Sequence, residues 1–366
     1  MKPYIYQKPD WPKFRWDNDA LQNLLLSVRT MQSKLIGKMD SLGFELQDEA
    51  ILETITTDVL KSTEIEGEIL NPEQVRSSIA RKLGMDISGL IPSDKNVDGV
   101  VEMMLDATQN YKSPLSKDRL FGWHSDLFPS ERSGMYKIVV GQWRDDSTGP
   151  IQVVSGALGK EKVHFQAPDA SVIEDEMNRF LDWFNSPIKL DPLLKAAIAH
   201  FGFVTIHPFD DGNGRIARAI TDMLLARADC SSQRFYSISA QIWLERKGYY
   251  EILEKSSQGT LDITKWLHWF LTCLLNALKA SDGMLARVMF KHQFWNKHAK
   301  TVLSQRQVLI LNKLLDNFDG KLSSSNWAKI AKCSHDTALR DIQDLITKNV
   351  LRNEGAGGRS TNYELK

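Results

Sequence analysis

The chain has 366 residues, of which 42% are hydrophobic and 25% charged, and its 46 basic side chains balance its 46 acidic ones. This length accommodates two or three domains with buried cores, and the composition is that of an ordinary soluble globular protein. The three cysteines, Cys230, Cys273 and Cys333, form neither a disulfide framework nor a zinc-binding spacing.

The sequence also argues against export and against a membrane span. Its first ten residues lack the apolar segment of a signal peptide. The most apolar stretch, 263–278, is interrupted by Lys265, His268 and Asn276, which is typical of a core helix. We therefore expect a cytoplasmic protein without membrane contact.

Helical periodicity dominates the chain, which predicts a mostly α fold. The first amphipathic pattern, with apolar residues three and four apart, runs from Leu21 to Met39. Asn71-Pro72 is a good helix start, with Asn as the cap and Pro at the first position. Further helices are predicted at about 47–62, 72–84, 97–112, 116–128, 171–185, 191–205, 213–228, 241–256 and 262–281.

The helix predicted at 47–62 is followed by an unusual acidic end. Glu64, Glu66 and Glu68 follow Ser62, and Gly67 is a natural terminator. Acidic residues at a helix C-terminus oppose the helix macrodipole, so local stability explains them poorly. This misfit suggests that another part of the protein pairs with the charge.

One segment departs from the helical pattern. Residues 152–155 and 162–165 are strand-like and flank the turn-like segment 156–161, which predicts a β-hairpin inserted in the helical body. A lone hairpin is only marginally stable. It is either a surface excursion packed on the helices or an exposed edge that pairs with an extended peptide.

The strongest chemical signal is the segment 207–215, His-Pro-Phe-Asp-Asp-Gly-Asn-Gly-Arg. The imidazole of His207 can take a proton from a hydroxyl near neutral pH. The carboxylate of Asp211 can hold one side of a hard divalent cation whose other ligands are phosphate oxygens and water.

The same segment also provides groups for binding phosphate. The amides of Gly212, Asn213 and Gly214 lie at a predicted helix N-terminus, where N–H groups are unpaired and the helix dipole is positive. Arg215 and Arg218 are three residues apart, so both can reach one polyphosphate. This layout fits phosphoryl or nucleotidyl transfer.

The segment resembles the motif of Fic-domain proteins, HxFx(D/E)GNGRxxR. Every defined position matches: His207, Phe209, Asp211, Gly212, Asn213, Gly214, Arg215 and Arg218. The surroundings are also similar: Trp11-Pro12, Gly141-Gln142-Trp143-Arg144, Ala167-Pro168 and Tyr249-Tyr250-x-x-Leu253. The resemblance covers roughly residues 1–282. Eight matching positions in register argue against a core loop in which His207 is only structural.

This resemblance implies a protein adenylyltransferase with ATP as substrate and Mg²⁺ as cofactor. His207 would be the general base for a Ser, Thr or Tyr hydroxyl of a target protein, whose oxygen attacks the α-phosphorus of ATP. Asp211 would hold Mg²⁺. The nucleotide would be bound by Gly212, Asn213, Gly214, Arg215, Arg218, Tyr249 and Tyr250, with Phe209 anchored in the core.

The resemblance also gives the hairpin a role, as a flap that aligns the target strand through Val153, Val154, Val163 and His164. His200 lies inside a predicted helix, and we expect it to be a core residue or one that supports the site, while a direct role stays open.

In Fic proteins an inhibitory motif, (S/T)xxxE(G/N), supplies a glutamate that pairs with the second motif arginine. Ser62, Glu66 and Gly67 match its defined positions. Glu66 would bind Arg218 and occupy the space of the γ-phosphate, so that ATP is not aligned for attack. The same glutamate could align a water molecule to remove AMP.

The resemblance and the charge distribution predict three domains: an N-terminal helical region at 1–95 with the inhibitory helix, a Fic core at 96–283, and a module at 284–366. The last carries 14 basic and 7 acidic residues. Helices at 305–318, 326–332 and 336–348 precede two strands and a glycine-rich turn, an order that resembles a winged helix-turn-helix.

In this module Ser334 is expected to cap the third helix, with Leu339, Ile342, Leu345 and Ile346 directed inward. DNA binding and protein contact both stay open. For DNA, the side chains facing the groove would be Lys332, His335, Thr337, Arg340 and Arg359. Against DNA, Asp336, Asp341 and Asp344 put negative charge on the same helix.

Other functions and partners also stay open. The chain could be a transcription regulator that senses nucleotide, or a Fic enzyme that transfers UMP, phosphate or phosphocholine. The expected partners are an unidentified target protein and the chain itself through autoadenylylation. A homodimer is a further alternative.

Overall fold

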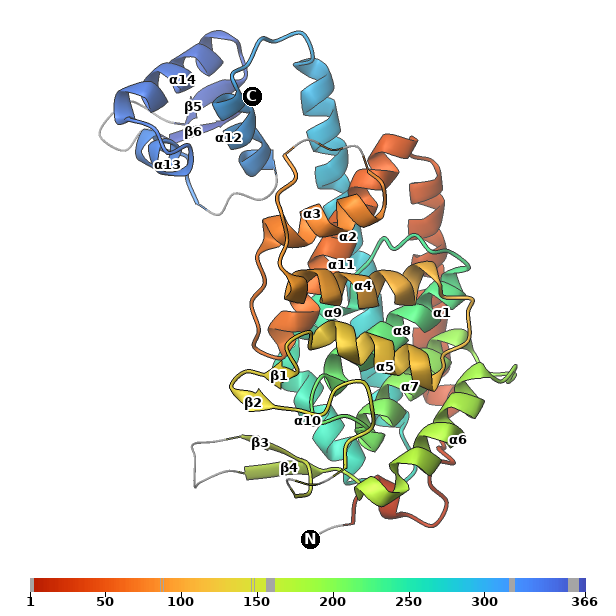
Figure 1. Cartoon of the computed structure of the whole chain (residues 1–366). Coiled ribbons are helices and arrows are strands. Elements are labelled where there is room, and N and C mark those ends of the chain that lie inside the picture. The colour runs from red at the N-terminus through yellow and green to blue at the C-terminus, as the bar shows by residue number, and fades with distance from the viewer. Residues whose placement is uncertain are drawn as a thin grey trace. The chain divides into compact units, whose positions relative to one another are not determined.

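The computed structural model describes residues 3–85, 87, 89–145, 147, 149–155, 162–315, 320–354 and 362–366. The chain divides into two compact units, Met1–Asp282 and Gly283–Lys366. Helices dominate both, and the strands of the described residues form three separate antiparallel hairpins (Figure 1). The predicted mostly α fold is confirmed.

The first unit contains the predicted helices, most with ends shifted by one to three residues. They are α1 (Asn18–Asp40), α2 (Phe44–Ile65), α3 (Pro72–Lys82), α4 (Lys95–Gln109), α5 (Lys117–Leu127), α6 (Ile173–Asn185), α7 (Pro192–Ile206), α8 (Asn213–Asp229), α9 (Ile238–Leu244), α10 (Arg246–Ser257) and the start of α11 (Thr264–Lys297). Two short 3₁₀ turns lie at Ile5–Gln7 and Ala170–Val172. Asn71 caps α3 as expected, its side chain accepting from the N–H groups of Glu73 and Gln74.

The core of this unit is built around α7 and α8. The sequence of α7 is apolar on all sides, and nearly all of its residues are buried, as expected for a helix surrounded by others. α8 packs along α7, and α2, α4 and α5 also contact α8. The turn between α7 and α8 holds residues 207–212, so the most conspicuous segment of the sequence lies in the centre of the unit.

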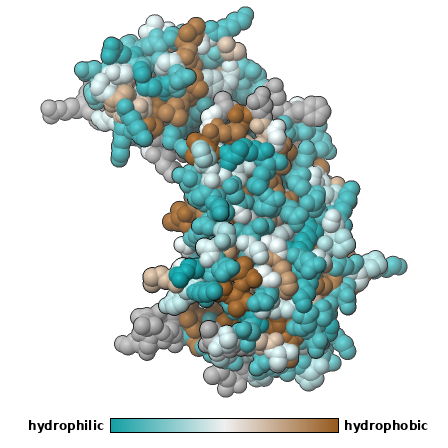
Figure 2. All heavy atoms as spheres, viewed as in Figure 1, coloured by the Kyte–Doolittle hydropathy of each residue, from teal (hydrophilic) through white to brown (hydrophobic). Residues whose placement is uncertain are grey.

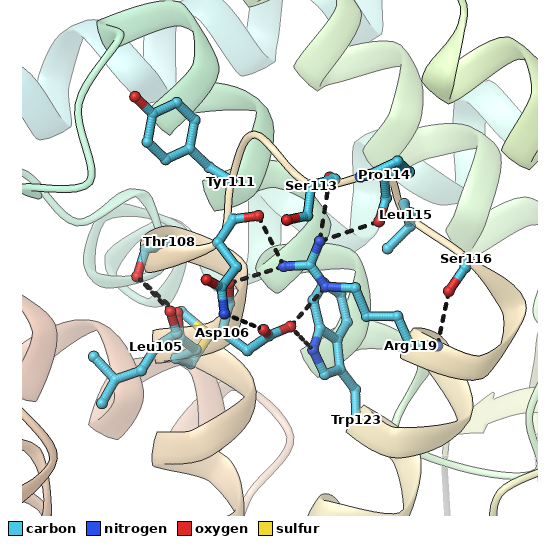
Figure 3. Close-up of polar contacts among 12 residues, drawn as sticks. Leu105, Asp106, Thr108, Tyr111, Ser113, Pro114, Leu115, Ser116, Arg119 and Trp123 are labelled. Carbon is cyan, nitrogen blue, oxygen red and sulfur yellow. Dashed lines mark hydrogen bonds and ion pairs between the residues drawn. The ribbon is translucent and has the colours of Figure 1, made fainter.

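A saturated polar cluster fixes the turn between α4 and α5 (Figure 3). Arg119 Nε donates to Asp106 Oδ2 at 2.6 Å, and Trp123 Nε1 donates to the same oxygen at 2.7 Å. The other two nitrogens of Arg119 donate to the backbone carbonyls of Asp106, Asn110, Ser113 and Pro114. The cluster holds two helices that pack against α8.

The structure corrects two of the expected helices. The segment predicted as one helix at 241–256 is two, because Glu245 leaves helical geometry (φ −102°, ψ 19°). The helix predicted to end at 281 continues to Lys297. Gly283 costs a helix only about 1 kcal/mol, and buried Leu285, Val288 and Phe294 continue the apolar pattern beyond it.

The predicted hairpin is confirmed as β3 (Gln152–Ser155) and β4 (Lys162–Gln166), with Val153 opposite Phe165. Its predicted turn, 156–161, lies outside the described residues. A second hairpin, β1 (Arg132–Ser133) and β2 (Tyr136–Lys137), was not expected from the sequence. Its turn begins at Gly134, which has a positive φ of 56°.

The second unit contains α12 (Gln305–Leu315), α13 (Ser324–Ile330), α14 (His335–Thr347) and the hairpin of β5 (Leu351–Glu354) and β6 (Asn362–Leu365). Ser334 caps α14 as predicted. The expected inward position of Leu339 is wrong, because its side chain is 40% exposed and Ala338, Ile342 and Leu345 form the buried stripe. The predicted helix end at 316–318 and the glycine-rich turn, with Arg359, lie outside the described residues.

Figure 2 shows a surface that is mostly hydrophilic, with separate hydrophobic patches. Among the residues that the structure describes, no helix combines the length and the apolar character needed to cross a bilayer.

Candidate functional site

His207 lies directly after α7 in a conformation that must be supported. Its backbone is left-handed (φ 54°, ψ 58°), which side-chain-bearing residues rarely adopt without help. Arg144 gives that help, because its Nε donates to the carbonyl of His207 at 2.8 Å and its N–H to that of Pro208 at 3.0 Å. Arg144 also donates to the carbonyl of Pro168, next to the end of β4.

The protonation of His207 follows from its surroundings. Nδ1 lies 3.3 Å from the carbonyl of Val204, which can only accept, so the neutral ring carries its proton on Nδ1 and Nε2 is the basic nitrogen. Desolvation lowers the pKa of His207 to about 4, and Arg144 adds to this shift. The side chain is therefore neutral at physiological pH.

Phe209 and Asn213 lock the loop that follows. Phe209 is fully buried, as predicted. Its N–H donates to Asn213 Oδ1 at 3.0 Å, and Asn213 Nδ2 donates back to its carbonyl at 2.8 Å. The side chain of Asn213 is thus used within the loop, and only its backbone amide remains for a ligand.

His124 of α5 supports the same loop and was not singled out from the sequence. Its ring stacks on Phe209 with centroids 4.1 Å apart. The N–H of Gly141 donates to Nδ1 at 3.2 Å, so the proton is on Nε2, which donates to the carbonyl of Asp211 at 3.2 Å. Burial lowers the pKa of His124 to about 4 and keeps it neutral. No local sequence pattern marks this role.

Asp211 is half-exposed and already holds several donors. Oδ1 accepts from the N–H of Gly212 at 2.6 Å, and Oδ2 accepts from the hydroxyl of Ser133 on β1. One of the three predicted phosphate-binding amides is therefore occupied by the neighbouring carboxylate. In the described part of the chain, no cluster of three or more His, Cys, Asp or Glu side chains could hold a metal ion.

Two glycines at the start of α8 have close neighbours. Gly212 has φ 82°, and a Cβ there would lie 2.9 Å from the ring of Phe128. A Cβ on Gly214 would lie 2.2 Å from Glu66 Oε1. The carboxylate of Glu66 thus lies directly against the first turn of α8.

The expected pairing of Glu66 with Arg218 is present. Arg218 Nη2 donates to Glu66 Oε1 and to the carbonyl of Ser62, both at 2.8 Å, and Nε donates to the Ser62 hydroxyl at 2.9 Å. The side chain of Arg218 is fully buried, whereas that of Glu66 is 32% exposed. Burial is the largest influence on Arg218 and lowers its pKa, but Glu66, Tyr249 and Tyr250 together outweigh burial, so the pKa of Arg218 is raised. Gly67 ends the segment with φ 89°.

The first motif arginine also has an acidic partner, which the sequence prediction did not include. Arg215 Nη1 donates to Glu68 Oε2 at 2.9 Å, and Nη2 lies 3.9 Å from Asp211 Oδ2. Within the described residues, Arg215 Nε and Arg218 Nη1 are buried and have no hydrogen-bond partner. Such orphaned donors are uncommon in folded proteins.

A cavity of about 550 Å³ opens beside this centre. Its lining includes the following predicted site residues: Glu66, Val153, Val154, His164, His207, Gly214, Tyr249 and Tyr250. Among the residues that the structure describes, the other predicted site residues are not part of the lining: Ser62, Gly67, Val163, Asp211, Gly212, Asn213, Arg215 and Arg218. The arginines are therefore separated from the open space, and Glu66 borders it.

The two tyrosines of the cavity differ in their contacts. Tyr249 is buried and its hydroxyl bonds His200 Nε2 at 2.8 Å. The Thr221 hydroxyl donates to the carbonyl of Ala217, so this hydroxyl accepts from His200 Nδ1. The proton of His200 is therefore on Nδ1, and Nε2 accepts from the hydroxyl of Tyr249. Tyr250 is half-exposed and donates to the carbonyl of Ile65 at 3.2 Å. Among the described residues, His200 is not part of the cavity lining but contacts it through Tyr249.

The hairpin is attached to the wall of the cavity by His164. Its Nδ1 lies 2.7 Å from Glu254 Oε2 on α10, and Gln258 Nε2 donates to its carbonyl at 3.2 Å. Val153, Val154 and Val163 are 38%, 47% and 39% exposed. The hairpin therefore presents apolar side chains to solvent beside the cavity.

The Fic/DOC family matches residues 114–225, and a domain of unknown function, DUF4172, matches residues 4–85. The chain is 28% identical over 181 residues to protein adenylyltransferase fic-1 of Caenorhabditis elegans, covering 48% of this chain and 32% of that protein. It is 35% identical over 115 residues to protein adenylyltransferase Fic of Nematostella vectensis, covering 31% of this chain and 25% of that protein. It thus spans about a third or less of these relatives.

Two solved structures share the fold. A Fic family protein from Desulfovibrio desulfuricans superposes with a TM-score of 0.53 at 19% identity, covering 100% of this chain and 98% of that one. A Fic domain containing signaling protein from Bacteroides thetaiotaomicron has a TM-score of 0.52 at 22% identity, covering 70% of this chain and 95% of that one.

Proposed function

Because residues 114–225 of this chain belong to the Fic/DOC family, we propose that it is a protein adenylyltransferase, which moves AMP from ATP to a Ser, Thr or Tyr hydroxyl. The observation that carries this proposal is the neutral His207, which lines a cavity of nucleotide size next to the N-terminus of α8. The curated relatives named above bear the same activity in their names.

The chemistry that this arrangement supports is an in-line displacement. His207 Nε2 takes the proton of the target hydroxyl, and the oxygen attacks the α-phosphorus. The bond from this phosphorus to the bridging oxygen breaks, pyrophosphate leaves, and AMP stays on the protein. The amides of Asn213 and Gly214 at the start of α8 stabilise the charge that develops on the phosphoryl oxygens.

The two motif arginines fit the terminal phosphates. Arg215 and Arg218 each retain a buried N–H group without a partner within the described residues. Phosphate oxygens are acceptors for such groups, and charge-assisted bonds to arginine are strong. Binding of ATP at these arginines requires that Glu66 gives up its place beside Arg218.

Asp211 suits a Mg²⁺ ion that travels with the nucleotide. Mg²⁺ is usually held by one or two carboxylates together with substrate phosphates and water. A single half-exposed carboxylate beside the start of α8 meets this requirement. When bound, the ion neutralises phosphate charge, while Ser133 orients the carboxylate.

Glu66 is proposed as a brake on this reaction. Its carboxylate pairs with the buried Arg218 and lies against Gly214, in the space next to the cavity. With Glu66 in place, the γ-phosphate loses its arginine and the α-phosphorus is not aligned for attack. The hairpin β3–β4 is proposed to align the target strand through its exposed valines.

The proposal is tested with purified full chain, Mg²⁺ and α-labelled ATP, CTP, GTP or UTP. Glu66→Gly is expected to label itself at least tenfold faster than wild type, with ATP preferred, and adding His207→Ala abolishes labelling. Absence of any labelled protein, with nucleotide bound but unchanged, favours a nucleotide-sensing regulator. Loss of label as free AMP from a prelabelled protein incubated with wild type indicates removal of AMP, and transfer from γ-labelled ATP indicates a kinase.

A DNA contact is proposed as a second function, for the second unit. Two of the acidic residues of α14 are paired within the unit, since Arg306 pairs with Asp341 at 2.9 Å and Lys348 pairs with Asp344 at 2.6 Å, while Asp336 stays exposed. Arg340 on α14 and Lys332 just before it are also exposed. These two basic side chains support a contact with a nucleic-acid backbone.

The test compares a basic residue of α14, Arg340, with Lys348 at its C-terminal end. Anisotropy of a labelled mixed-sequence duplex is measured against salt, with Arg340→Ala and Lys348→Ala as a matched pair. The salt slope is expected to fall by about 0.9 for Arg340→Ala alone. Equal slopes for both variants, or no binding at low salt, exclude this DNA contact.

A further inference from the structure

Two carboxylates at the end of α2 bind two different motif arginines. Glu66 pairs with Arg218, and Glu68 pairs with Arg215 at 2.9 Å. Gly67, with φ 89°, lies between them and turns the chain so that both side chains reach α8. The third glutamate of the segment, Glu64, is directed elsewhere and pairs with Lys61 at 2.7 Å.

We propose that Glu68 is a second inhibitory carboxylate, which competes with the phosphates of a nucleoside triphosphate for Arg215. This inference rests on the proposed function of the same site. The segment 62–68 then occupies both phosphate-binding arginines at once, as two carboxylates in place of two phosphates. Removing Glu66 alone releases only one of them.

The geometry indicates that Glu68 is not needed to build the site. The side chain of Arg215 is 6% exposed, whereas that of Glu68 is 42% exposed. An ion pair with one solvent-exposed partner contributes less to stability than a fully buried pair. The guanidinium also lies over the ring of Phe128 at 4.9 Å, and its Nη2 is 3.9 Å from Asp211. These contacts keep Arg215 in place when Glu68 is absent.

The position of Glu68 determines which nucleotides change in affinity when Glu68 is replaced. Arg215 and Arg218 are three residues apart on α8 and lie in its first and second turns. A monophosphate has no further phosphate to reach Arg215, so its affinity does not depend on Glu68. A triphosphate must displace this carboxylate, so its affinity does. The ratio of ATP affinity to AMP affinity therefore reports the competition.

The experiment measures the Kd of ATP and of AMP by calorimetry on the full chain, without target protein. The variants are Glu68→Gln, Glu66→Gly, both together, and Glu64→Gln as the matched control from the same helix end. Glu68→Gln is expected to tighten ATP about threefold, the scale of a partly exposed ion pair. AMP affinity stays unchanged, and Glu64→Gln changes neither.

The inference is overturned if Glu68→Gln leaves the ATP affinity unchanged, tightens ATP and AMP equally, or behaves like Glu64→Gln. It is separable from the proposed function. If Glu68→Gln binds ATP more tightly but no protein is labelled, the inference about Glu68 holds and the proposed transferase activity is wrong. If Glu66→Gly labels itself but the Kd of ATP does not depend on Glu68, the inference is wrong and the transferase activity holds. If no variant binds ATP, both are wrong.

Discussion

Two arginine centres of the first unit differ in how completely their hydrogen-bond donors are satisfied; the side chain of Arg119 is 12% exposed and that of Arg218 is fully buried. Arg119 makes five side-chain hydrogen bonds, and all of its partners lie within 13 residues along the chain (Figure 3). Arg218 is paired with residues 152 and 156 positions away, and its Nη1 has no hydrogen-bond partner among the described residues.

This difference separates a structural from a functional charge. Leaving a buried donor unpaired costs about 1–3 kcal/mol. We therefore expect every hydrogen-bond donor to have a partner in a centre that only stabilises the fold. The Arg119 cluster is saturated. The Arg215 and Arg218 centre is incomplete, and its acidic partners come from a segment that we propose is displaced by phosphate. Single buried atoms without a partner also occur elsewhere among the described residues, as at Asp222 and Trp327, so we infer that two such donors on neighbouring motif arginines mark the ligand site.

The largest expected effect comes from a substitution at the proposed functional site. In the Glu66→Gly background, His207→Ala is expected to lower the rate of labelling about 1,000-fold, the contribution of a general base. The Kd of ATP changes less than twofold, since the imidazole contacts the target hydroxyl. Single-turnover labelling and calorimetry measure the two quantities. Retention of more than a tenth of the rate assigns the base to another residue.

The next largest effect comes from a substitution in the structural centre around Arg119. Arg119→Met removes the partner of Asp106, a half-buried carboxylate, and is expected to lower the free energy of unfolding by about 2 kcal/mol, below the loss for a fully buried pair. The affinity for ATP stays unchanged. Urea unfolding gives the first value and calorimetry the second.

Lys117→Met is the matched control for Arg119, because Lys117 pairs with Glu174 and both are exposed. Its expected loss is under about 0.5 kcal/mol. A weaker ATP affinity in Arg119→Met, without such a loss in the control, would show that the two centres are coupled, and the distinction drawn between them would fail.

The sequence reveals the part of the site that is contiguous. His207 to Arg218 are read from one short stretch, because a helix N-terminus needs only neighbouring residues. The Glu66 motif is found by its spacing, and the structure contains the expected pair. The strands of the flap and the caps at Asn71 and Ser334 are equally local.

The remainder depends on tertiary packing and has no local signal. His124 and Ser133 reach Asp211 from 87 and 78 residues away. Glu68 was visible as an excess of acid at a helix end, but its partner Arg215 is 147 residues distant. The break at Glu245 interrupts the backbone within a continuous helical pattern, so periodicity misses it.

A smaller effect follows from pH. Burial lowers the pKa of His200 to about 3. The unfolded state binds a proton near pH 6.5 and the folded state does not, so stability falls as the pH drops from 6.5 towards 3. From pH 7 to 5.5 we expect a loss of about 1 kcal/mol from this residue.

This acid sensitivity sharpens the comparison, because His200 supports Tyr249 at the functional centre, whereas the polar cluster around Arg119 is built without histidine. Urea unfolding of wild type and of His200→Phe at both pH values gives the change of the unfolding free energy with pH, separately from the stability that the substitution itself removes. Hydrogen exchange at pH 5.5 should quicken in α7 and α10 before α4 and α5. An equal slope in both proteins would place the proton elsewhere.

The smallest effect concerns Gly214, whose substitution should change sign with Glu66. In a helix Ala is favoured over Gly by about 1 kcal/mol. With Glu66 present, however, the new Cβ would lie 2.2 Å from its carboxylate oxygen and 3.0 Å from its carboxyl carbon, so the ion pair with Arg218 must shift. We therefore expect Gly214→Ala to destabilise wild type by about 1 kcal/mol and to stabilise Glu66→Gly by a similar amount or less.

A double-mutant cycle, measured by urea unfolding, gives the coupling energy between Gly214 and Glu66 directly. Gly248→Ala, also within a helix and 3.7 Å from the indole nitrogen of Trp269, is the control that should behave alike in both backgrounds. If Gly214→Ala has the same effect with and without Glu66, the carboxylate does not rest on the first turn of α8 in solution, and the centre is already open to phosphate.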